Sequence, residues 1–222
     1  MEVRDDSATG IPWGCGVNAC PPWTHIPKPD RVARLPHIGA MPVVFITCYS
    51  TNPVPTVLGR NGVEAGCDCT YGIGKPQIGV QCTIRQRQVM AERRCSVCGQ
   101  TAPGEELLFA GVERSAEFGG RLFSMEGGAH AECLAYSAQT CPVLVANRGK
   151  VTVAATREYG LVKRLILGHR ADRPVYGLWP HGVPHGPLGT LDFHIAVFDD
   201  QHTRTLMLDT WLCDEAPDLG RL

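Results

Sequence analysis

Four residues in the middle of the chain have the types and spacing of a metal site. Cys95 and Cys98 are separated by two residues and followed by Gly99, and His130 and Cys133 lie three positions apart. The Cys-x-x-Cys-Gly pattern is typical of a tight turn that points both sulfurs at one ion, because glycine tolerates the left-handed backbone after the second ligand. A His and a Cys in the first turn of a helix can reach the same ion. The pattern predicts one Zn²⁺ bound by three thiolates and an imidazole.

The residues between the two ligand pairs indicate the elements that would bring the pairs together. Two strand-like runs, 106–112 and 121–125, flank a Gly-rich turn at 117–120 and predict a β-hairpin. A helix is expected over 129–139, where alanine and leucine side chains recur on one face. Knuckle, hairpin and helix follow one another in the order of a treble-clef zinc finger. We therefore expect residues 93–144 to form a treble-clef-like finger.

The four-ligand set predicts a structural ion. A site with four protein ligands leaves no position for a substrate, and structural zinc contributes on the order of 10 kcal/mol in small peptides. Two catalytic alternatives fit less well. A His-Me nuclease needs a histidine on the hairpin, and none lies between Cys98 and His130. A zinc deaminase places its His-x-Glu before its Cys pair, whereas His130 and Glu132 follow the pair here.

Length and composition limit the class of protein. The 222 residues fit one ordinary domain or two small ones, and a net charge of -1 does not favour a dedicated polyanion binder. No apolar run is long enough to span a membrane. The N-terminal stretch is polar and acidic, unlike a signal peptide, so the eleven cysteines are expected in a reducing compartment. We expect a cytoplasmic protein.

Cysteines outside the finger could form a second metal site or could be buried or free thiols. Their one-residue spacing is poorer than Cys-x-x-Cys, and the sequence does not determine a fourth ligand. The candidate ligands are Cys67, Cys69 and Cys82, with one of Cys15, Cys20 or Cys48.

Three histidines near the C-terminal end are a separate candidate cluster. His181 and His185 lie in a loop rich in Pro and Gly, and His194 lies on a strand expected over 191–198. They could form a catalytic or second metal site only if the loop folds back on itself. Otherwise the loop histidines are exposed to solvent.

A basic helix is expected over 83–94, directly before the first Cys pair. Its positive side chains could contact a nucleic-acid or protein partner, but a solvated helix face is the simpler interpretation. No aromatic residue is interleaved to stack on bases. The basic residues are Arg85, Arg87, Arg93 and Arg94.

These elements predict an α+β fold, a small mixed domain organised around the finger. The parts are a loop-rich segment (1–40), a strand with a Cys-rich loop and the basic helix (41–92), the finger (93–144) and a C-terminal α/β portion packed on the same domain (145–222). Further elements expected are strands at 42–50 and 151–156 and helices at 159–167 and 203–213.

The finger motifs resemble those of small, largely uncharacterised actinobacterial proteins. The shared pattern is Gln86 to Met90 leading into Cys-x-x-Cys-Gly, then His130-x-x-Cys133, then Cys141 followed by proline. The resemblance covers roughly residues 40–213. It implies a Cys-rich, zinc-finger-like protein and no particular activity.

Two classes of function fit these features. The first is a zinc-stabilised binding or regulatory protein whose finger presents a surface to a protein or nucleic-acid partner. In its favour, the sequence has no nucleophile elbow, phosphate loop or dinucleotide fingerprint. The alternative is a small metal-dependent enzyme, such as one of specialised metabolism. Its site would use Cys67, Cys69 and Cys82, or His181, His185 and His194.

Overall fold

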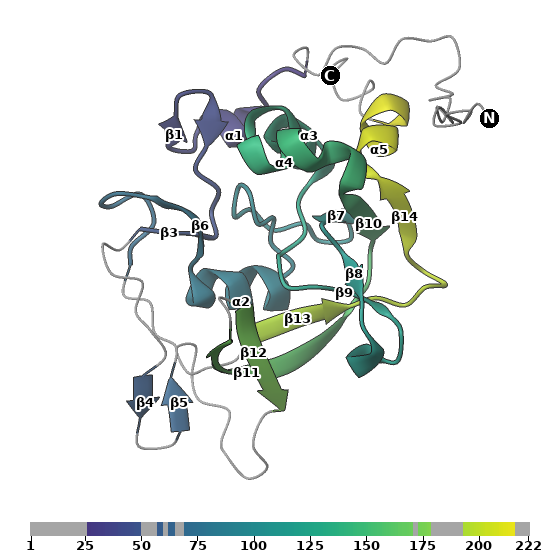
Figure 1. The fold of residues 1–222 in the computed structure, drawn as a ribbon. Helices are drawn as coiled ribbons and strands as arrows, with labels where there is room; N and C mark the ends of the chain where they lie inside the picture. The colour runs from purple at the N-terminus through teal and green to yellow at the C-terminus, as the bar shows by residue number, and fades with distance from the viewer. Residues whose placement is uncertain are drawn as a thin grey trace, which may run out of the picture.

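The chain is a mixture of helices and antiparallel strands, which confirms the α+β class. The computed structural model describes residues 26–49, 57–59, 62–64, 69–170, 173–178 and 193–215, with only the backbone for 57–59, 62–64, 163–170, 173–178 and 193. Helices α3 (Ala131–Thr140), α4 (Pro142–Asn147) and α5 (Leu208–Asp214) lie on one side of the central strands, and α2 (Thr83–Ala91) lies on the other (Figure 1).

A three-stranded sheet divides the buried side chains into two clusters. Successive side chains of a strand point to opposite faces. Leu108 therefore joins the apolar cluster beside α3 and α5, whereas Leu107 and Phe109 join the cluster beside α2. Val153 and Ala154 divide in the same way. The strands, in sheet order, are β14 (Arg204–Met207), β10 (Thr152–Thr156) and β7 (Leu107–Ala110).

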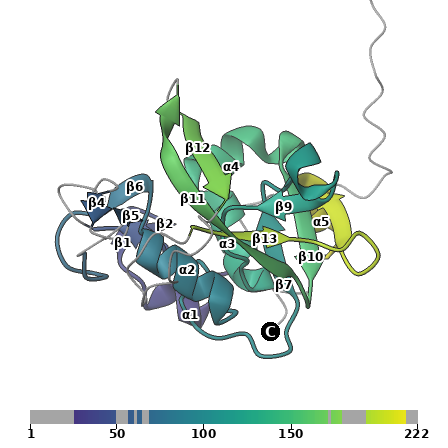
Figure 2. The same cartoon turned by 90° about the horizontal axis from the view of Figure 1, so that it is seen from below.

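A five-stranded sheet packs against α2 on the second side. Gln86 of α2 is fully buried, and its Nε2 donates to the carbonyl oxygens of Met125 (2.9 Å) and His194 (2.6 Å). Two strands of this sheet extend as a long arm from the body (Figure 2). In sheet order the strands are β12 (Arg173–Leu178), β11 (Gly160–Arg170), β13 (Phe193–Val197), β9 (Leu122–Ser124) and β8 (Glu113–Arg114), of which β11 and β12 form the arm.

The first part of the described chain consists of short elements around the finger. The strand expected over 42–50 is divided, because its middle residues hydrogen-bond to the turn at 95–99, named the metal-site turn, instead of continuing as a strand. Phe45 N–H donates to the carbonyl of Val97 at 2.8 Å, and Ile46 N–H to that of Ser96 at 3.3 Å. The short elements are α1 (Asp30–Ala33), β1 (His37–Ile38), β2 (Met41–Pro42), β3 (Thr47–Cys48), β4 (Val57–Gly59), β5 (Gly62–Glu64) and β6 (Gln77–Gln81).

Three predicted elements differ from the structure. The helix expected over 159–167 is strand β11, because a short apolar run fits either period and pairing with β13 decides it. The helix expected over 203–213 begins as strand β14, and only its second half is helical. The runs expected to pair as a hairpin lie in different sheets, since β7 pairs with β10 whereas β9 pairs with β8 and β13.

Candidate metal centre

The four predicted ligands converge on one point. Their ligand atoms all lie within 4.8 Å of one another. Sulfurs bound to a single tetrahedral zinc ion would be about 3.8 Å apart, given metal–sulfur bonds of about 2.3 Å, so a small contraction completes the site. The four-ligand cluster, which could hold a metal ion, consists of Cys95, Cys98, His130 and Cys133.

The first ligand pair is positioned by a tight turn. Gly99 N–H donates to the carbonyl of Cys95 at 2.8 Å, and Cys98 N–H points at the Cys95 sulfur at 3.5 Å. Gly99 has φ +74°, and a Cβ there would lie 2.7 Å from the ring of Phe45. Glycine is thus required both for its backbone conformation and for the close approach of the aromatic ring.

The second ligand pair is positioned by strand β7 and the start of α3. Leu108 and Ala129 exchange backbone hydrogen bonds of 2.9 and 2.8 Å, which fixes the chain just before the helix. His130 is the N-cap of α3 and Cys133 lies in its first turn. The backbone N–H of His130 points at the Cys95 sulfur at 3.4 Å. The N-terminal end of α3 favours thiolates through its dipole.

The imidazole of His130 faces the sulfurs through one nitrogen and a carboxylate through the other. Nδ1 lies 3.5 Å from the Cys98 sulfur and 4.0 Å from that of Cys133. Nε2 lies 3.6 Å from a carboxylate oxygen of Glu105. This nitrogen is buried without a hydrogen-bond partner among the described residues. A carboxylate that moved to hydrogen-bond distance would orient a metal-bound histidine and increase its basicity. No spacing rule pointed to Glu105, because its contact with His130 forms only in the folded chain.

The four ligand side chains strongly shift one another's pKa values. Hydrogen bonds from Cys133 and Cys95 hold the pKa of the Cys98 thiol far below its ordinary value. Hydrogen bonds with Cys95 and Cys98 raise the pKa of the Cys133 thiol. Burial alone would lower the pKa of His130, but interactions with Cys95 and Cys98 outweigh it and raise the pKa to about 10. A metal ion must displace protons from Cys133 and His130, so its binding releases protons.

Of the other predicted metal ligands, some lie within the described residues and some do not. Among the residues that the structure describes, the four-ligand cluster is the one group of three or more His, Cys, Asp or Glu side chains close enough to hold an ion. The sulfurs of Cys48 and Cys69 lie 3.9 Å apart, and Cys82 is buried at the N-cap of α2. His194 is buried on β13. Cys15, Cys20, Cys67, His181 and His185 lie outside the described residues.

The basic helix does not present the solvated face that we expected. Arg85 and Arg87 are only 7% and 2% exposed. Arg85 donates to the carbonyl oxygens of Phe45 (2.7 Å) and Thr47 (2.5 Å), so it fixes the segment that binds the metal-site turn.

The last two arginines of this run are also engaged within the protein. The guanidinium of Arg93 lies 5.0 Å from the centre of the Tyr159 ring. Arg94 pairs with the Glu92 carboxylate at 2.6 Å and donates to the carbonyl of Gly99 at 3.1 Å. These contacts join α2 to the core and to the metal-site turn, and they reduce what the four arginines can offer a nucleic acid.

Comparisons with known proteins give no relative. No family model matches the chain, and no curated protein or solved structure matches it significantly. The resemblance to actinobacterial finger proteins therefore stays a prediction. No helix in the described part of the chain is long and apolar enough to cross a membrane.

Replacing one ligand tests the cluster. We expect Cys98→Ser to reduce bound metal to a small fraction of the wild-type content and to lower the thermal midpoint by more than about 10 °C, because a buried site loses a thiolate. Metal analysis and calorimetry measure the two effects. Cys141→Ser, at a thiol outside the cluster, is the control. A Cys98→Ser protein with wild-type metal content and stability would contradict the assignment.

The contact between Glu105 and His130 makes a second prediction. Glu105→Gln should weaken metal binding about tenfold without abolishing it, since partners of metal-bound histidines typically contribute 10- to 100-fold. Competition against a chromophoric chelator measures the affinity. Glu106→Gln is the matched control, because Glu106 lies 3.5 Å from Arg204 instead of near the cluster. Equal affinities for the two variants would exclude a role for Glu105.

Proposed function

We propose that this is a binding or regulatory protein in which a structural zinc ion holds a treble-clef-like finger, residues 93–144, in its folded form. The observation that carries the proposal is the four-ligand cluster, which supplies every position of a tetrahedral site and lies almost entirely out of solvent. Three sulfurs and one imidazole are a typical zinc set. A closed set leaves no position for a substrate, which favours a structural role.

The finger also contributes to a concave surface. A groove of about 850 Å³ runs between the helices and the sheets, and the metal-site turn forms part of its wall through Ser96 and Val97. Ala129, next to the ligand His130, lines it as well. The ion would therefore fix one wall of a cavity whose size is typical of ligand sites. This position supports a binding function for the finger.

The kind of partner follows from the charges on this surface. Arg85 and Arg87 are buried, and the charged residues that line the groove are acidic. Both facts weigh against a nucleic-acid partner and favour a partner that carries positive charge.

A metal-dependent enzyme is the second candidate, and one observation favours it. The sulfurs of Cys48 and Cys69 lie close together, and the Arg85 guanidinium donates to the Cys69 sulfur at 3.1 Å. A thiolate stabilised in this way could bind a second ion or react as a nucleophile. Counting the ions in the purified protein distinguishes the two functions.

Cobalt substitution tests the proposal. We expect one Co²⁺ per chain, with the absorption of a tetrahedral site rich in thiolates, and no spectral change when azide is added, because no coordination position is open. Azide binding, or a second equivalent of tightly bound metal, would contradict a purely structural role and favour the enzyme.

A further inference from the structure

The groove has apolar walls contributed by elements far apart in the sequence. Ile78 and Val80 of β6 are 50% and 37% exposed, and Val143 of α4 is 67% exposed; all three line the groove. Phe123 of β9 and Met125, the residue after the strand, line it as well. Exposed large apolar side chains gathered around one cavity, rather than scattered, indicate a binding site.

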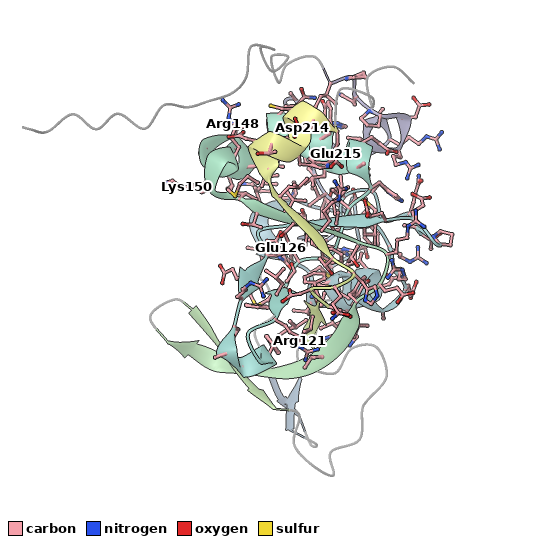
Figure 3. The ribbon with its side chains drawn as sticks, turned by 90° about the vertical axis from the view of Figure 1, so that its right-hand side faces the viewer. Arg121, Glu126, Arg148, Lys150, Asp214 and Glu215 are labelled. Carbon is pink, nitrogen blue, oxygen red and sulfur yellow. The ribbon has the colours of Figure 1, made fainter. Side chains whose placement is uncertain are left out.

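The charged side chains of this apolar groove all have the same sign. Glu113, Glu117 and Glu126 line it, and no lysine or arginine of the described residues does. In Figure 3, Glu126 lies at a height between the helical end marked by Arg148 and the sheet end marked by Arg121. Like charges repel, so this lining disfavours an anionic ligand and favours a cationic one.

Glu126 is exposed to solvent and lines the groove. The protein atoms around it nevertheless remove enough water to raise its pKa, an effect that a hydrogen bond with the Gln81 side chain opposes in part. A positive charge beside a carboxylate that protein partly surrounds is screened less than it would be in open water.

Two further polar atoms on the groove lining lack partners. The hydroxyl of Ser137, on α3, is buried and has no hydrogen-bond partner among the residues that the structure describes, and the same holds for Oε1 of Gln81. Buried polar atoms are normally satisfied, and leaving one unsatisfied costs about 1–3 kcal/mol. Both side chains line the groove, so a small movement of either one would bring its unpaired atom to a bound donor.

We infer that the groove binds an organic cation, a primary amine on an apolar body, with the ammonium beside Glu126 and the body against Ile78 and Val80. An ammonium brings a positive charge and three donors, which suit the carboxylate of Glu126. The apolar walls accommodate the hydrocarbon. This inference rests on the proposed binding function and names the class of ligand.

Three probes with the same apolar body test the inference. Calorimetric titration of the zinc-loaded full chain with 4-phenylbutylamine, 4-phenylbutanol and 4-phenylbutyrate compares a cation, a neutral molecule and an anion. We expect the amine to bind at least about tenfold more tightly than the alcohol, since hydrogen bonds to charged groups are the stronger ones. The carboxylate should bind more weakly than both.

Variants locate the site. Glu126→Gln should weaken amine binding about tenfold and leave alcohol binding within about twofold. Ile78→Ala, at an exposed wall position, should weaken both probes, because it removes apolar surface and not charge. Glu158→Gln, an exposed carboxylate away from the groove, should bind all three probes as the wild type does.

Some results would overturn the inference. Equal affinities for amine and alcohol, or amine binding that survives Glu126→Gln, would remove the cation site. Binding of lysine-containing peptides without binding of the free amine would replace the small cation by a protein partner. Failure here with a closed cobalt site refutes only the ligand class, whereas an azide-sensitive cobalt site refutes the proposed function.

Discussion

The convergence of three sulfurs and one imidazole is the constraint on which the rest of the structure depends. The ligands come from a tight turn and from a helix start that are separated by about thirty residues of sheet. Like partial charges gathered out of water are unfavourable without a cation, so the cluster favours a bound metal ion. Such an ion would turn an electrostatic cost into a link between α3, strand β7 and the turn at Cys95.

The core is arranged to hold that link rigidly. Strand β7 carries Leu108 on the face toward α3 and Phe109 on the face toward α2, so the same short strand contacts both apolar clusters. Its backbone pairs with Ala129, directly before the ligand His130. Arg85 fixes the segment that covers the metal-site turn. The groove forms where these parts meet, which places its wall under the control of the metal site.

Local features could be predicted from the sequence, whereas features that depend on distant contacts could not. Cys95 to Gly99 and His130 to Cys133 are close in sequence, so their geometry follows from turn and helix rules. The turn expected at 117–120 does form a hairpin, but it joins β9 to β8 and not to β7. β7 pairs instead with β10, and β9 also pairs with β13, some seventy residues away, and these distant partners could not be read from the local pattern. The burial of Arg85 needs the carbonyls of 45–47, and the role of Glu105 needs the folded loop. The groove combines side chains from segments spread between Met41 and Ile195, and no periodicity indicates it.

The geometry around the ion tests the central claim most directly. X-ray absorption at the zinc edge of the purified protein measures the number, type and distance of the ligands. The account predicts three sulfurs at about 2.3 Å and one nitrogen at about 2.0 Å, in a four-coordinate site. A shell rich in oxygen, a fifth ligand, or protein that folds without any bound metal would contradict it.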